Sequence, residues 1–153
     1  MAASDSAPRR FGDLAPSVYP GERLGLPESG SHSVARLGRR IAALVVDWAL
    51  AIAAGYLVFG FNPWAAVGAP DGRSWLPLAA FFVLQLVFIP TIGGSIGHRV
   101  LGLRVVPLVG GWVGLWRPLV RTALLVIVVP ALVWDSDQRG FHDKVAGTVL
   151  IRA

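Results

Sequence analysis

The sequence contains no cysteine, and it is poor in charged residues for its length of 153 residues. The absence of cysteine excludes disulfides, thiolate metal sites and cysteine nucleophiles. Charged residues make up 15% of the chain, whereas soluble domains carry about 25%. Because a soluble domain of this size needs a polar surface, the shortage of charge predicts that much of the surface faces a lipid bilayer.

Motifs of catalysis and of metal binding are also missing. The chain has three histidines but no HExxH or similar pair, and it has no nucleophile elbow, phosphate-binding loop or paired-carboxylate pattern. Its 14 Lys and Arg exceed its 9 Asp and Glu, but the arginines flank apolar runs and do not alternate with aromatic residues. We therefore expect no enzyme, no cofactor, no metal and no nucleic-acid partner.

Residues 1–33 are rich in proline, glycine and serine, and they lack the apolar run of a signal peptide. Such a stretch cannot bury enough apolar area to offset the entropy lost on ordering. We interpret it as a disordered cytoplasmic tail that precedes a membrane domain at residues 34–152. A docking peptide at Tyr19-Pro20-Gly21 is an alternative role for part of this tail.

Two apolar stretches have the length of membrane-spanning helices. Residues 41–61 contain one ionisable residue, Asp47, and residues 75–92 contain none. At about 1.5 Å per residue, each stretch matches a hydrocarbon core of about 30 Å. Pro90 is expected to kink or end the second helix. Residues 119–134 form a shorter apolar segment, which either crosses the membrane with a tilt or re-enters and returns.

The arginine positions predict the orientation of these segments. Arg36, Arg39 and Arg40 precede the first span, whereas Arg73 is the basic residue of the loop that follows it. Because cytoplasmic loops carry the excess of Lys and Arg, the N-terminus is expected in the cytoplasm. If residues 119–134 re-enter and return, every Lys and Arg except Arg73 lies inside. We therefore favour the return over a full crossing.

Short segments rich in β-branched residues, 103–106 and 148–151, are typical of strands, and residues 109–112 contain a Gly-Gly pair typical of a hairpin turn. We predict a small β element at the cytoplasmic face, because unpaired backbone groups cannot face lipid. The predicted fold is an all-α membrane protein with two long transmembrane helices, a short third spanning or re-entrant segment and this β element.

Asp47 is the charge that most needs a partner. A carboxylate inside a spanning helix costs about 2.5–3.5 kcal/mol on insertion scales, so it should be paired, protonated or in contact with water. Arg40 lies on the same helix face but too far along the axis for a relaxed contact. Arg121 is the expected partner. Two interpretations stay open: an ion or proton site, and a buried charge pair that locks the first helix to its neighbours.

Asp143 follows His142 directly, but adjacent side chains rarely face one another, so no acid–base dyad is expected. Asp143 is expected to cap a helix N-terminus or to pair with Arg99 or Arg104. It completes a candidate network, for an ion or proton or for structure alone, of four residues: Arg40, Asp47, Arg121 and Asp143.

These motifs, in this order, resemble the RDD family of bacterial membrane proteins, which is named for one Arg and two Asp. The resemblance rests on residues 36–47, residues 93–106, Arg117, Arg121 and residues 139–149. It implies that Arg40, Asp47 and Asp143 are the name-giving residues. Arg39 is a competing choice for the arginine.

The resemblance implies a multi-pass protein of the plasma (inner) membrane with an undefined activity. Transport of ions or small ligands, including cation/proton exchange, is the function it suggests. So small a membrane domain suggests a homo-oligomer or a membrane-protein partner for such transport. The alternative is a non-catalytic adaptor or accessory subunit, whose tail and basic cytoplasmic face recruit partners or anionic lipid.

Overall fold

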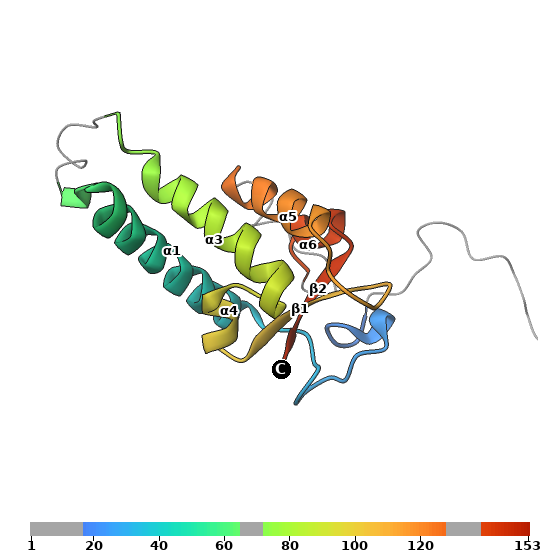
Figure 1. Ribbon diagram of the computed structural model, residues 1–153. Helices are drawn as coiled ribbons and strands as arrows, with labels where there is room; N and C mark the ends of the chain where they lie inside the picture. The colour runs from blue at the N-terminus through green and yellow to red at the C-terminus, as the bar shows by residue number, and fades with distance from the viewer. Residues whose placement is uncertain (1–16, 65–71, 128–138) are drawn as a thin grey trace, which may run out of the picture.

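The computed structural model describes residues 17–64, 72–127 and 139–153. Two long helices, α1 (Leu37–Phe59) and α3 (Leu76–Ile92), lie side by side and run in opposite directions (Figure 1). The smaller elements gather around the end of the molecule where α1 begins and α3 ends. They are η1 (Glu22–Leu24), α4 (Ile96–Val100), β1 (Leu103–Pro107), α5 (Trp116–Val126), α6 (Phe141–Val145) and β2 (Thr148–Arg152).

Every fourth residue of α1 and α3 is buried, which places one narrow stripe of each helix in the interior. The stripes are Ala43, Asp47, Ala51 and Gly55 on α1, and Pro77, Phe81, Gln85 and Ile89 on α3. Small residues on α1 let the helices approach closely, and a Cβ added at Gly55 would lie 3.6 Å from the Pro77 side chain. Each stripe therefore places one polar residue, Asp47 or Gln85, at the helix interface.

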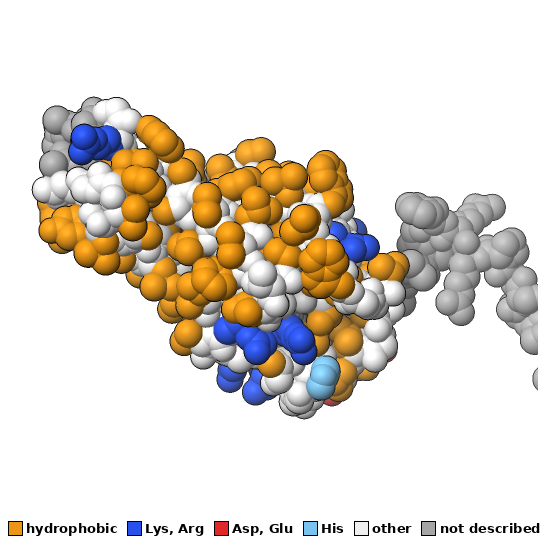
Figure 2. All heavy atoms as spheres, in the orientation of Figure 1, with side chains coloured by type: hydrophobic (Ala, Val, Ile, Leu, Met, Phe, Trp, Pro, Cys, Tyr) orange, Lys and Arg blue, Asp and Glu red, His pale blue; other side chains and the backbone are white. Residues whose placement is uncertain are grey.

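Much of the remaining surface of α1 is hydrophobic and exposed, and most of the remaining surface of α3 is hydrophobic and partly exposed. Helix α1 has 23 residues and is long and apolar enough to cross a membrane, and only 22% of its most apolar stretch is buried. Helix α3 is also apolar but has 17 residues. Hydrophobic side chains cover this part of the surface, while Lys and Arg gather mainly near α4 and the strands (Figure 2). The prediction of a mostly helical fold with a small β element is thus confirmed. Of the two long helices predicted to span a membrane, α1 has the length and composition of a span.

The helix ends differ slightly from those predicted. Helix α1 starts four residues before residue 41 and ends at Phe59, because Gly60 adopts a left-handed φ of 66°. Helix α3 continues past Pro90 to Ile92, and Gly93 ends it with a φ of 73°. The segment predicted at 119–134 is helical as α5 up to Val126. Residues 128–138 lie outside the described residues, so the choice between crossing and return stays a prediction.

The two predicted strands form, and they pair with each other in antiparallel fashion, with Leu103 opposite Arg152 and Pro107 opposite Thr148. The prediction that residues 109–112 form the turn of a β-hairpin was wrong. Gly110 and Gly111 do form a turn with left-handed φ values of 75° and 79°, but β1 pairs with β2 and not with the residues after this turn. The pairing with β2 buries Leu103 and Val105 in the same core cluster as Leu150.

Residues 32–35 run along the free edge of β2. The Ala35 amide donates to the Leu150 carbonyl at 2.8 Å, and the His32 amide donates to the Arg152 carbonyl at 2.8 Å. Residues 17–33, which the sequence assigned to a disordered tail, thus include backbone that β2 orders. Residues 1–16 lie outside the described residues, so disorder there stays a prediction.

Candidate functional site

Asp143 is a fully buried carboxylate that pairs with two arginines. Arg40 Nη1 of α1 donates to Asp143 Oδ2 at 3.1 Å, and Arg121 Nη1 of α5 donates to Oδ1. Thr148 Oγ1 donates to Oδ1 at 3.3 Å. Because these partners come from α1, α5 and β2, the carboxylate of α6 connects four elements. Arg39, the competing choice, is exposed and donates to the Leu101 carbonyl instead.

The surroundings keep Asp143 ionised and its neighbouring histidine neutral. Burial opposes ionisation of Asp143, but the charge of Arg121, together with that of Arg40, outweighs burial and lowers the pKa of the carboxyl. Burial is also the main reason why the pKa of His142 falls to about 4. At neutral pH one carboxylate therefore faces two guanidinium groups.

The partners predicted for Asp143 were wrong. Side chains alternate between the two faces of β1, and Arg104 lies on the exposed face. Arg99 is exposed on α4. Asp143 is not the cap of α6 either, because Gly140 occupies that position. The inward face of α6 meets α5, so its carboxylate meets Arg121 rather than the surface arginines.

Asp47 lies in a separate cluster of hydrogen bonds. Its Oδ2 accepts from Gln85 Nε2 at 3.0 Å and from Ser95 Oγ at 2.5 Å, and its Oδ1 accepts from the Gly97 amide at 2.7 Å. The prediction that Arg121 pairs with Asp47 was wrong, because the Arg121 guanidinium pairs with Asp143 instead. Three donors without formal charge meet the carboxylate instead, and they fasten α3 and α4 to α1.

The start of α4 is built around Ser95 and His98. Ser95 Oγ accepts from the His98 amide at 3.1 Å, and the Ser95 amide donates to His98 Nδ1 at 3.0 Å. Because Nδ1 accepts this bond, the ring proton resides on Nε2. Burial, aided by the charge of Arg121, lowers the pKa of His98 to about 3, so the ring is neutral.

Gly97 is required by the close approach of α4 to α1. A Cβ at this position would collide with the Ala43 carbonyl and lie 2.9 Å from Asp47 Oδ1. Gln85, Ser95, Gly97 and His98 were not among the predicted site residues. Two signals were available: a lone amide in an apolar helix, and a Ser-x-x-His spacing like that of a capping box.

A cavity of about 240 Å³ joins the two clusters. Its polar wall comes from six residues: Arg40, Asp47, Gln85, His98, Arg121 and His142. Three of these residues have a buried polar atom without a hydrogen-bond partner among the described residues, namely Gln85 Oε1, Arg121 Nε and His142 Nδ1. The cavity thus brings the predicted Arg40, Asp47 and Arg121 together, with Asp143 bonded to two of them. Buried polar groups of this kind can bind a ligand.

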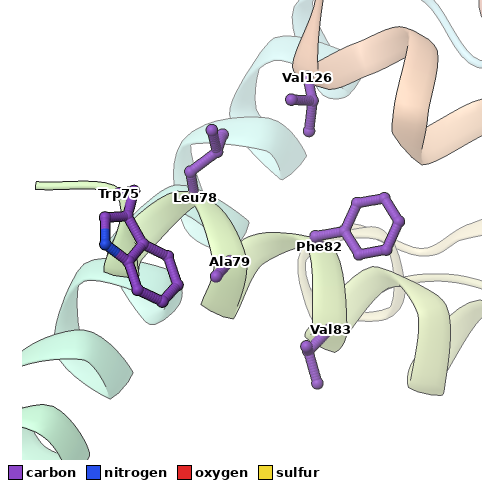
Figure 3. Close-up of a pocket in the computed structure, with 6 residues that line it drawn as sticks. All are labelled: Trp75, Leu78, Ala79, Phe82, Val83 and Val126. Carbon is purple, nitrogen blue, oxygen red and sulfur yellow. The ribbon is translucent and has the colours of Figure 1, made fainter. Parts of the chain in front are cut away.

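A second hollow, of about 350 Å³, lies between α3 and α5 and is apolar throughout (Figure 3). It is lined by Trp75, Leu78, Ala79, Phe82, Val83 and Val126. These side chains offer no group for acid–base chemistry, so the candidate functional site is the polar cavity. Among residues 17–64, 72–127 and 139–153, no group of three or more His, Asp or Glu is placed to hold a metal ion.

Comparison with known proteins gives one result that bears on this site. The model of the RDD family matches residues 34–147, which contain all four residues of the predicted network. No curated protein and no solved structure matches the chain. The family match, the apolar helix α1 and the buried Arg–Asp pairs agree with one another. The chain belongs to the RDD family, whose members are generally membrane-associated bacterial proteins.

Proposed function

We propose that the protein is a multi-pass protein of the plasma membrane that takes a small ligand into the polar cavity at its cytoplasmic end, as part of a transport process. The cavity is the observation that carries this proposal. Ionisable and amide side chains are costly inside a membrane domain and generally mark functional sites there. The polar atoms of Gln85, Arg121 and His142 without a partner in the described residues would gain hydrogen bonds from a ligand.

The arrangement of the chain supports two crossings and a cytoplasmic N-terminus. Helices α1 and α3 run in opposite directions, and the exposed arginines near the start of α1 and on α4 lie at one end of this pair. Residues 32–35 pair with β2, so the start of the membrane domain and β2 lie at the same end. This supports a third segment that returns to the side from which it started.

The hydrogen bonds of Asp47 bear on the kind of ligand. Three donors already meet this carboxylate, which favours the interpretation that it locks α4 onto α1. Arg121 has a guanidinium N–H without a partner in the described part of the chain. The guanidinium groups of Arg40 and Arg121 share one carboxylate, that of Asp143. This group of three keeps a net positive charge, so a small anionic ligand fits the cavity better than a cation.

A thermal-shift experiment on the purified protein tests the cavity as a ligand site. Small anions, cations and zwitterions are added to the wild type and to Leu44→Trp, which fills part of the cavity. We expect the anions to raise the melting temperature of the wild type, because a ligand at 100 times its dissociation constant contributes about 2.7 kcal/mol of stability. The proposal fails if no class shifts the wild type, or if the variant responds equally.

A second candidate function is cation/proton exchange at Asp47, which is the one carboxylate among the described residues lining the cavity. Proteoliposomes containing a pH-sensitive dye test it with the wild type, Asp47→Asn and the control Glu28→Gln, whose acid is exposed. We expect no Na⁺- or K⁺-driven proton flux above that of empty liposomes. Flux in the wild type and in Glu28→Gln that disappears in Asp47→Asn would establish the exchanger instead.

A further role as an adaptor is favoured by the exposed arginines at the same end of the molecule, which suit an anionic lipid surface or an acidic partner. They are Arg36, Arg39, Arg99 and Arg104. Each such charge near an anionic leaflet contributes about 1 kcal/mol. Crosslinking with and without residues 1–16 tests the adaptor role, and an unchanged set of crosslinked proteins would count against recruitment by the tail.

A further inference from the structure

The polar cavity has a charged end and an apolar end. We propose that it binds an amphiphile with one small anionic head group and one alkyl chain, with the head near Arg121 and His98 and the chain along Ile41 and Leu125. This inference deepens the proposed function, and it rests on the same cavity being a ligand site.

The charged end favours an anion. Asp143 supplies one negative charge for Arg40 and Arg121 together, so this group of three keeps a net positive charge. The negative charge of Asp47 is met by its own three donors. Arg121 Nε–H is buried without a partner in the described residues, and the proton on His98 Nε2 adds a second donor in the wall. A carboxylate or similar group would supply the acceptors that these donors lack.

The apolar end favours an alkyl chain. Ile41 and Leu44 of α1 and Leu125 of α5 line the cavity together with Leu150 of β2. Leu37 also lines it, and its side chain is 41% exposed, while that of Ile41 is 52% exposed. These two residues carry the apolar wall to the surface of α1, where the helix faces lipid in the proposed arrangement. A chain that enters here would continue along that surface.

The size of the cavity limits the ligand to one chain. Its volume of about 240 Å³ is smaller than the roughly 300–1,000 Å³ of sites that enclose a drug-sized molecule. A head group and the first part of one alkyl chain fit this space better than the head and two chains of a phospholipid. The alternatives are a free small anion without a chain and a two-chain anionic lipid.

Native mass spectrometry of the full chain in a non-ionic maltoside detergent tests the ligand class. The probes are decanoate, decylammonium and acetate, and each is titrated against the protein. We expect one decanoate per chain, with binding at least tenfold weaker for decylammonium, which has the wrong charge, and for acetate, which lacks the chain. Equal binding of decylammonium would overturn the proposal by showing partition into an apolar surface. Equal binding of acetate would also overturn it, because the ligand would then be a free anion without a chain. A two-chain lipid that stays bound to the protein and is not displaced by decanoate would overturn the proposal of a single-chain ligand.

Two matched variants locate the bound molecule. Leu125→Trp fills the cavity, whereas Val58→Trp adds the same side chain at an exposed position near the other end of α1, among the residues that do not line the cavity. We expect Leu125→Trp to weaken decanoate binding at least tenfold and Val58→Trp to leave it unchanged. If Leu125→Trp does not fold, Ile41→Trp at the rim provides the same test. Equal affinity in the cavity variant and in Val58→Trp would contradict the site.

These results also separate this inference from the proposed function. One outcome is that acetate or phosphate binds, that Leu125→Trp abolishes this binding, and that decanoate does not bind. The cavity is then a ligand site, but the inference that its ligand is an amphiphile is wrong. If no probe depends on Leu125, both the inference and the proposed function fail.

Discussion

Asp143 carries one negative charge between two buried guanidinium groups, and the change Asp143→Asn leaves those groups facing each other without it. Breaking a buried ion pair by removing one partner costs about 3–5 kcal/mol. We expect a loss of this size in the free energy of unfolding, measured in detergent by chemical denaturation. Glu28→Gln, which neutralises an exposed acid, should change the value by less than about 0.5 kcal/mol. Similar values for the two variants would show that the ion pairs contribute no stability.

The two buried histidines make stability depend on pH. Their folded pKa values, about 3 for His98 and about 4 for His142, lie below the unfolded value of 6.5. The unfolded chain therefore binds more protons below pH 6.5, and stability falls as the pH decreases from there towards 4. Each histidine contributes up to about 1.4 kcal/mol per pH unit.

A melting-temperature series from pH 7.5 to 4.5 measures this effect, and His98→Asn should reduce the slope by about half. Asp143 does not contribute in this window, because its pKa is lowered and its stabilising charge is lost only below the unfolded value of 3.8. A flat profile above pH 4.5 would mean that the histidines are not buried in the neutral form.

At the residue scale, the sequence identified Asp47 as a charge in need of partners but did not identify those partners. Asp47 was recognised because a carboxylate in an apolar run needs compensation. Its true partners include a backbone amide, that of Gly97, and such a donor has no side-chain signature. The pairing of Arg121 with Asp143 depends on where α6 packs, and five residues of helix give no periodicity from which to predict it.

At the scale of elements, Gly97 determines how closely α4 lies against α1. The change Gly97→Ala places a methyl group against the Ala43 carbonyl, and backbone cannot move aside as a flexible side chain can. Overpacking of this kind costs about 1–3 kcal/mol, so we expect a lower melting temperature. Gly38→Ala is the control, because it is helical with open space around the added methyl, and it should raise stability by up to about 1 kcal/mol. Equal effects of the two changes would contradict the contact between α4 and α1.

The long helices and the two strands could be predicted because hydropathy and β-branched residues act locally. The pairing of the strands could not, because β1 and β2 are distant in the sequence and the Gly-Gly turn between them suggested a nearer partner. The hydrogen bonds between residues 32–35 and β2 also join segments that are distant in the sequence, so they could not be predicted either. Composition alone therefore gave no sign that residues 32 and 33 lie beside β2.

At the scale of the whole molecule, the absence of cysteine allows each residue to be labelled by itself. We expect a membrane-impermeant maleimide to modify Gly72→Cys in intact cells, and to modify Val109→Cys and Ala153→Cys only after the membrane is opened. Gly72 lies in the loop predicted to face outward, whereas the Ala153 amide donates to the Gly102 carbonyl beside β1. Labelling of Ala153→Cys in intact cells would mean that the third segment crosses the membrane.

The bond between Arg40 and Asp143 joins residues 103 positions apart, and this separation has a consequence for biosynthesis. In the proposed two-crossing arrangement, α1 and α3 are translated well before Asp143 leaves the ribosome, so they enter the bilayer without the ion pair that later ties α1 to α6. Insertion then comes first, and closure of the charged centre comes afterwards. In that arrangement a ribosome stalled before residue 143 would leave a chain that is already anchored in lipid but still open at the end that holds Arg40.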